Sequence, residues 1–120
     1  MKYRDLNEEE ERVILHKGTE YPATGKYDKY YENGKYFCKR CETALFTSES
    51  KFKSGSGWPS FDAGIDKSVK EIPDRDGSRV EIVCEKCDGH LGHVFRGEGF
   101  TDKNARFCVN SISLIHEKDL

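Results

Sequence analysis

Cys38-Lys39-Arg40-Cys41 and its counterpart Cys84-Glu85-Lys86-Cys87 decide how this chain of 120 residues can fold. In each stretch two sulfur atoms lie on one side of a tight turn, where they can share a tetrahedral metal ion. The interval between the two pairs exceeds the usual spacing of a compact zinc ribbon, so the ion would tie together segments that are distant in sequence. We predict one structural Zn²⁺ ion held by all four cysteines.

Two other chemistries fit the same cysteine pairs. Each pair could be a redox-active dithiol, or the four thiolates could hold iron as an electron-transfer centre. A red-brown protein would indicate iron, whereas a colourless protein with about one zinc ion per chain would indicate structural zinc. Four protein ligands close the coordination sphere of zinc, so on this interpretation the metal is scaffold and binds no substrate.

Composition limits both the size of the core and the range of partners. Hydrophobic and charged residues each make up 35% of the chain, so a metal site would supplement a modest core, and we predict one domain over residues 1–120. The formal net charge is -2, and zinc bound by four thiolates makes it more negative still. This balance disfavours a broad surface for nucleic acid or anionic lipid.

The N-terminal residues carry no apolar segment of the signal-peptide type, and no apolar run reaches membrane length. Five cysteines without such a segment fit a reducing compartment. We therefore expect a cytoplasmic protein that binds no membrane, and we expect it to be a monomer.

One short helix and several strands follow from local patterns. Asn7 and Glu10 form a capping box and Lys17-Gly18 supply a stop, which predicts a helix over residues 7–17. Aromatic residues flank Asn33-Gly34, a pair that suits a two-residue hairpin turn. Asp76-Gly77 is a similar turn before residues 79–82, which alternate polar and apolar as a half-buried strand does.

A further strand is predicted over residues 107–115, with Arg106, Cys108 and Asn110 on one face if the extended geometry begins one residue earlier. Residues 51–57 are rich in Ser, Gly and Lys and predict a loop. The fold class is therefore mainly antiparallel β.

Cys108 remains once four cysteines are assigned to the metal. A lone cysteine is usually an inert, small core residue, but Arg106 on the same strand face can favour its thiolate. Asn110 offers a donor and an acceptor to a polar ligand or to water. These neighbours favour a reactive thiol.

Two histidines follow the second cysteine pair in His90-Leu91-Gly92-His93-Val94-Phe95. A metal that fixes Cys87 also fixes these imidazoles nearby. Either histidine could be a metal ligand or a hydrogen-bonding partner of the cysteine turn, which is a fair interpretation of His90. For His93 we favour general acid chemistry.

The single tryptophan lies in the loop Gly55-Ser56-Gly57-Trp58-Pro59. Most single tryptophans are core anchors. On a loop beside a reactive thiol, however, an aromatic face can contact a thioether-like group and its terminal methyl. Both interpretations of Trp58 are open at this point.

In these motifs the chain resembles the methionine-(R)-sulfoxide reductases, the B-type methionine sulfoxide reductases, over nearly its whole length. The resemblance is carried by Lys17-Gly18-Thr19-Glu20, the two Cys-X-X-Cys pairs, Gly57-Trp58-Pro59-Ser60-Phe61, His90-Leu91-Gly92-His93-Val94-Phe95 and Arg106-Phe107-Cys108-Val109-Asn110-Ser111. It implies two antiparallel sheets with a short N-terminal helix, and an enzyme that repairs oxidised methionine in proteins or peptides.

The resemblance also implies a role for each motif. Cys108 attacks the sulfoxide sulfur and becomes a sulfenic acid, and His93 donates the proton. The positions of His90, Asn110 and Arg106 match residues that organise the oxygen, water and thiolate. Trp58 matches the aromatic wall that receives the substrate methyl, and Phe95 packs near the pocket.

The resemblance also makes the chain's departures from the family pattern visible. Many members have a resolving cysteine in the tryptophan loop, whereas this chain has Ser56, so an external thiol such as thioredoxin must regenerate the enzyme. Many also have an acidic residue shortly after the His-Val-Phe segment, where this chain reads Arg96-Gly97.

Two functions of other classes compete with an enzyme. A zinc-ribbon module could use Lys35, Lys39 and Arg40 against nucleic acid, but the net charge is negative and no basic stripe is evident. A purely structural zinc protein would leave Cys108 and His93 without a use.

Overall fold

The computed structural model describes residues 3–75 and 77–118, which contain one α-helix, α1 (Glu8–Ile14). The predicted capping box is confirmed: the Asn7 side chain accepts from the Glu10 amide, and the Glu10 carboxylate accepts from the Asn7 amide. The helix ends at Ile14, earlier than predicted, because Lys17 rather than the following glycine adopts the left-handed conformation (φ 60°). Within these residues no helix is long and apolar enough to cross a membrane.

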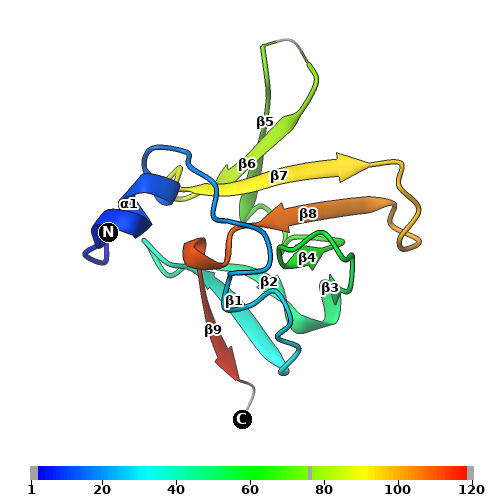
Figure 1. The fold of residues 1–120 in the computed structure, drawn as a ribbon, viewed down its shortest axis with the longest axis horizontal. Helices are drawn as coiled ribbons and strands as arrows, with labels where there is room; N and C mark the ends of the chain where they lie inside the picture. The colour runs from blue at the N-terminus through cyan, green and yellow to red at the C-terminus, as the bar shows by residue number, and fades with distance from the viewer. Residues whose placement is uncertain (1–2, 76, 119–120) are drawn as a thin grey trace.

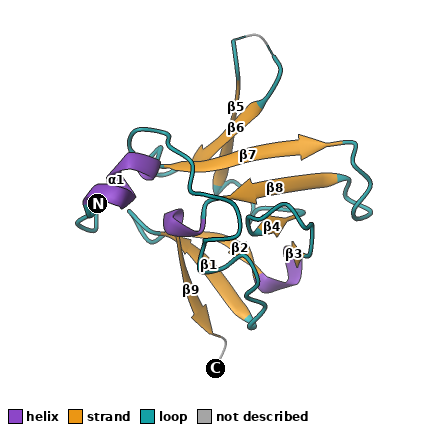
Figure 2. Cartoon of the chain, viewed as in Figure 1, coloured by secondary structure: helices purple, strands orange, loops and turns teal. Residues whose placement is uncertain are grey.

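Nine strands and two short 3₁₀ helices make up the rest of the regular structure in these two described ranges. They are β1 (Gly34–Cys38), β2 (Ala44–Thr47), η1 (Ser48–Ser50), β3 (Lys51–Phe52), β4 (Ser60–Phe61), β5 (Val69–Pro73), β6 (Val80–Cys84), β7 (His90–Arg96), β8 (Ala105–Val109), η2 (Ser111–Ser113) and β9 (Leu114–Lys118). They form a three-stranded sheet, β2-β1-β9, and a six-stranded sheet, β3-β4-β8-β7-β6-β5, with every pairing antiparallel (Figures 1 and 2). The predicted fold class, with two antiparallel sheets and a short N-terminal helix, is confirmed.

Aromatic side chains from both sheets meet in the core. Phe46 of β2 stacks on Phe61 of β4 with ring centroids 4.3 Å apart, and Tyr36 of β1 packs edge-on against Phe61 at 5.0 Å. All three are fully buried. The core therefore lies between the two sheets, and the strands that border it are held rigidly.

The predicted hairpin turn at Asn33-Gly34 is wrong. Gly34 opens β1, which pairs with β2 and β9 but with no preceding segment of the described chain. The glycine is needed for a different reason: a Cβ atom there would lie 2.0 Å from the Glu117 carbonyl oxygen of β9, and its φ is 149°. It permits close strand packing instead of a turn.

The single strand predicted over residues 107–115 is also wrong, because the chain changes sheets within it. β8 belongs to the six-stranded sheet and β9 to the three-stranded sheet, with η2 between them. At the junction both the backbone amide and the side-chain amide of Asn110 donate to the Leu91 carbonyl, at 2.8 and 3.0 Å. These bonds fix Asn110 at the point where the strand ends.

The strand predicted at residues 79–82 is present as β6, in a hairpin with β5. Gly77 in the connecting turn has a positive φ of 72°, whereas Asp76, its predicted partner in the turn, lies outside the described residues. The expected alternation fails at Glu81, which is buried. The predicted loop over residues 51–57 begins with β3, and the rest of it is irregular.

Candidate active site and metal centre

The four paired cysteines meet where the two sheets come together. Cys38 ends β1 and Cys84 ends β6, while Cys41 and Cys87 lie in the turns that follow. All four Sγ atoms lie within 4.8 Å of one another, and the Cys38–Cys87 and Cys41–Cys84 distances are 3.6 Å. Zinc with bonds of about 2.3 Å places tetrahedral sulfurs about 3.8 Å apart. The predicted four-cysteine site fits one structural zinc ion.

The surroundings of this cluster are those of a closed structural site. The Gly89 amide donates to Cys87 Sγ at 3.4 Å, and Arg40 Nη1 donates to the Cys87 carbonyl at 3.0 Å, which ties one cysteine turn to the other. Neither His90 nor His93 belongs to the cluster, so the alternative of a histidine ligand is not supported in the described chain. The metal site joins the two sheets, and neither imidazole is used as a metal ligand.

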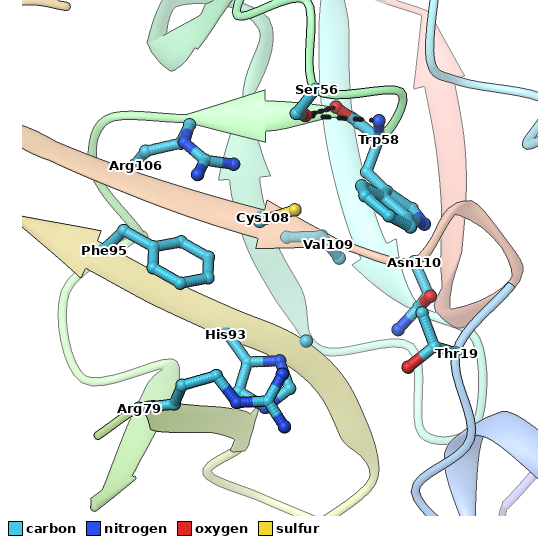
Figure 3. A pocket seen from close by; sticks show the side chains of 11 residues that line it. Thr19, Ser56, Trp58, Arg79, His93, Phe95, Arg106, Cys108, Val109 and Asn110 are labelled. Atoms are coloured by element: carbon cyan, nitrogen blue, oxygen red, sulfur yellow. Dashed lines mark hydrogen bonds between the residues drawn. The ribbon is translucent and has the colours of Figure 1, made fainter. Parts of the chain in front are cut away.

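A cavity of about 200 Å³ lies over strands β7 and β8 (Figure 3). It brings together six of the seven residues predicted for catalysis and substrate binding, namely Trp58, His93, Phe95, Arg106, Cys108 and Asn110. In Figure 3, Cys108 occupies the centre, with Ser56 and Trp58 on one side and His93 on the other. His90 is the exception and does not line the cavity.

Strand register explains why these side chains converge. β7 and β8 are antiparallel neighbours in which His93 lies opposite Cys108 and Phe95 lies opposite Arg106. Opposed residues of an antiparallel pair project from the same face, with Cβ atoms about 4.5–5.5 Å apart. A thiol and an imidazole therefore share one wall of the cavity.

The environment of Cys108 contains opposing influences. Burial raises the pKa of the Cys108 thiol, while Arg106 and a hydrogen bond from Ser56 act in the other direction. Arg106 is itself paired with Glu98 through two hydrogen bonds of 2.8 and 3.2 Å, and its guanidinium lies 4.5 Å from the Phe95 ring centroid. The free thiol is thus mainly protonated at neutral pH.

The acid that follows the His-Val-Phe segment in this chain is Glu98, one position beyond Arg96-Gly97. Its carboxylate forms an ion pair with Arg106, so in this chain the acid orients the arginine instead of a histidine.

His93 is kept neutral by its surroundings. Burial lowers the pKa of His93, and the nearby charge of Arg79 lowers it further. Arg79 also lines the cavity, where Figure 3 shows it beside His93, and Asp74 lies 3.7 Å from its guanidinium. Sequence reasoning missed Arg79 because it directly precedes β6, far from the catalytic motifs in sequence. The pairing of β6 with β7 brings it to the site.

His90 lies behind the cavity, almost fully buried. Its Nδ1 is 2.7 Å from a carboxylate oxygen of Glu81, whose other oxygen accepts from Lys17 Nζ at 2.9 Å. Burial raises the pKa of Glu81, but these hydrogen bonds outweigh it and the pKa is lowered overall, so Glu81 is an anion that orients the imidazole. The His90 ring packs edge-on against His93 with centroids 5.8 Å apart. Glu81 was missed because its alternating strand predicts an exposed carboxylate.

Glu20 connects Trp58 and Asn110, two residues that line the cavity. Trp58 Nε1 donates to the Glu20 carbonyl at 3.0 Å, and the Glu20 amide donates to Asn110 Oδ1 at 3.0 Å. The Glu20 carboxylate accepts from the Ser111 amide, and Thr19 lines the cavity. Residues 17–20 were singled out in the sequence only for their resemblance to the family, and this connection was not predicted.

Gly92 allows the two central strands to approach closely. A Cβ atom there would lie 1.9 Å from the Cys108 carbonyl oxygen, a distance that no side chain permits. The absence of a side chain at this position therefore sets where the Cys108 backbone lies.

Comparisons with known proteins agree with these features. A family model described as the SelR domain matches residues 6–118. The chain is 53% identical over 110 residues to peptide methionine sulfoxide reductase B2, chloroplastic, of Arabidopsis thaliana, covering 91% of this chain and 54% of that one. It is 54% identical to the chloroplastic B3 protein of Oryza sativa subsp. japonica, of which it covers 48%, and 50% identical to the B5 protein of Arabidopsis thaliana, of which it covers 79%.

The chain thus spans about half the length of the two chloroplastic relatives. Among solved structures, the Mis18 Yippee-like domain superposes with a TM-score of 0.54 at 16% identity, over 72% of this chain and 97% of that one, which shows a shared fold alone. The match to the SelR model and the identity to the B-type reductases are much more specific. On this evidence the chain belongs to the SelR domain family, together with these B-type peptide methionine sulfoxide reductases.

Proposed function

We propose that this chain reduces methionine R-sulfoxide in peptides and proteins to methionine, with Cys108 as the nucleophile. One observation carries the proposal: the Cys108 thiol lies opposite the His93 imidazole in a small cavity whose far wall is Trp58. A nucleophile, a proton donor and an aromatic surface for a methylthio group are the parts that the reaction requires.

The first half-reaction starts when Cys108 passes its proton to the neutral His93 and the resulting thiolate attacks the sulfoxide sulfur. The sulfoxide oxygen takes a proton from His93 and is transferred to the Cys108 sulfur, which becomes a sulfenic acid while the substrate leaves as methionine. The cysteine sulfur loses two electrons and the substrate sulfur gains them. Before the step His93 is neutral and Cys108 is protonated, so the pair carries one transferable proton, which is the number that the step uses.

The other predicted residues have supporting roles on this scheme. Arg106, held by Glu98, stabilises the thiolate, and Asn110 presents its amide to the sulfoxide oxygen or to a bound water. His90, which is oriented by Glu81, packs edge-on against the His93 ring and positions it. Trp58 receives the substrate methyl, and Phe95 lines the cavity on the side of Arg106 and His93.

We infer that an external thiol completes the cycle. A hydroxyl cannot form a disulfide, so Ser56 does not resolve the sulfenic acid, and the other four cysteines belong to the metal cluster. Two external thiols, from thioredoxin or a small thiol, convert the sulfenic acid back to the thiol, with release of water and formation of a disulfide.

The test is the reduction of separated R and S epimers of methionine sulfoxide with dithiothreitol. We expect turnover of the R epimer alone, abolished by Cys108→Ser with the zinc content unchanged. Activity on neither epimer would refute the proposal. After one turnover without reductant, a sulfenic-acid reagent should label Cys108, and a disulfide from Cys108 to a zinc cysteine would contradict direct reduction.

The nucleic-acid alternative gains little support from the basic residues named for it. Lys39 Nζ lies 3.3 Å from a carboxylate oxygen of Glu10, and Arg40 binds the Cys87 carbonyl and packs on the Tyr3 ring. Lys39 and Arg40 are committed to internal contacts, and of the three named residues Lys35 alone is exposed.

We propose a monomer in a reducing compartment such as the cytoplasm, since reduced cysteines serve both the metal and the reaction. Size-exclusion chromatography and cell fractionation test these two points.

A further inference from the structure

A second cavity, of about 240 Å³, borders the first and plays no part in the chemistry described above. Trp58 lines both cavities. In the loop before it, Ser56 faces the catalytic cavity, whereas Gly55 and Gly57 line the second. We call this second cavity the flanking groove. The two cavities are therefore neighbours on either side of the Trp58 loop.

The walls of the flanking groove are aromatic and fixed in place. Tyr31, Phe52 and Trp58 all line it. Tyr31 is 49% exposed, yet the Lys51 ammonium lies 3.9 Å from its ring centroid and donates a 3.2 Å hydrogen bond to the Asp28 carbonyl. An exposed, immobilised ring can pack against a ligand with little loss of conformational entropy.

The rim of the groove is positively charged. Lys29 and Lys53 line it and are exposed, and within the described parts of the chain neither ammonium group has a carboxylate at ion-pair distance. Asp28 is the one acidic residue among its described lining residues. The whole chain carries a net charge of -2, so this local positive charge opposes the overall balance.

We propose that the flanking groove binds the polypeptide next to a methionine sulfoxide and favours segments with acidic side chains. The proposal rests on the proposed function and deepens it by naming the substrate class. The adjacency of the two cavities at Trp58 supports a segment of the same substrate, and the lysines on the rim are complementary to carboxylates. The aromatic walls fit the apolar parts of such a segment.

The experiment compares three substrates with dithiothreitol as reductant: N-acetylmethionine R-sulfoxide, and two otherwise identical R-sulfoxide peptides flanked by glutamate or by lysine. Exposed ion pairs are weak, so we expect kcat/KM to favour the acidic peptide by roughly three- to tenfold at low salt, and less at high salt. Lys53→Glu should remove or reverse this preference and leave the N-acetylated substrate unaffected.

Lys35→Glu is the matched control, because Lys35 is also an exposed lysine, lies on β1 of the other sheet, and its replacement changes the charge by the same amount. Equal rates for the two peptides, or equal effects of Lys53→Glu and Lys35→Glu, would overturn the groove proposal. So would a Lys53→Glu effect that arises only with thioredoxin as reductant, since the groove would then receive the reductant. Failure to reduce even the N-acetylated substrate would instead refute the proposed function.

Discussion

Replacing Gly92 with alanine places a methyl group between β7 and β8 at the point where the thiol and imidazole are aligned. The new Cβ would lie 1.9 Å from the Cys108 carbonyl oxygen, whereas ordinary contact begins at 3.4 Å. The two strands must therefore separate by about 1.5 Å. A displacement of about 1 Å at a reacting group costs roughly 10²-fold in rate, so we expect a loss of at least that size.

The assay is a single turnover with enzyme in excess over a methionine R-sulfoxide peptide and no reductant, which isolates the chemical step. Zinc content and circular dichroism identify the folded fraction, because overpacking also lowers the free energy of unfolding by about 1–3 kcal/mol. Gly64→Ala is the control: its new Cβ would lie 3.1 Å from the Val69 Cγ2 atom, and a side chain can yield by a few tenths of an ångström. A zinc-loaded Gly92→Ala variant with the wild-type rate would refute the reasoning.

Three further predictions test the metal, the connecting segment and the titration of the site. Cys84→Ala should release zinc and lower the thermal midpoint, and a stable, zinc-replete variant would contradict four-cysteine ligation. Glu20→Ala leaves the Ser111 amide unpaired, which should lower the free energy of unfolding by about 1–3 kcal/mol in denaturant titrations. The same variant should raise KM more than it lowers kcat. An unchanged KM would show that Glu20 has no part in substrate binding. Burial lowers the pKa of His93 below 6.5 and raises that of Cys108 above 9.0. Below the pKa of His93 the pair gains a second proton and no thiolate can form, and above the pKa of Cys108 the pair loses its one proton and no acid remains. The second-order rate constant of a single turnover should therefore stay level between pH 6.5 and 9. A rise or fall of that rate constant inside the interval would count against this pair.

Local chemistry was the part of this molecule that the sequence could predict. The Cys-X-X-Cys pairs and the Asn7 capping box depend on residues a few positions apart, and both are found as predicted. The alignment of Arg106 and Cys108 also followed from the two-residue period of a strand. Such features need no knowledge of how distant segments pack.

The errors arose where tertiary packing overrides local pattern. The 107–115 run is apolar enough for one strand, but bonds from Asn110 to Leu91 end it and send the chain to the other sheet. Gly34 resembles a turn residue but serves the close approach of β9. Glu81 alternates as a surface residue would, yet it is buried because His90 and Lys17 are its partners. Each requires knowledge of a partner that is distant in sequence.

The metal and the reaction are linked through strand register, although no zinc ligand lines the catalytic cavity. Cys84 ends β6 and Cys87 lies in the turn that leads into β7, so zinc fixes where β7 begins relative to β6. A slip of one residue would turn His93 to the opposite face of the sheet and away from Cys108. The ladders that β7 forms with β6 and β8 oppose that slip, and a structural zinc site adds about 10–16 kcal/mol of apparent binding free energy. Zinc loss should therefore abolish activity by misplacing His93 while leaving the Cys108 thiol chemically intact and open to alkylation.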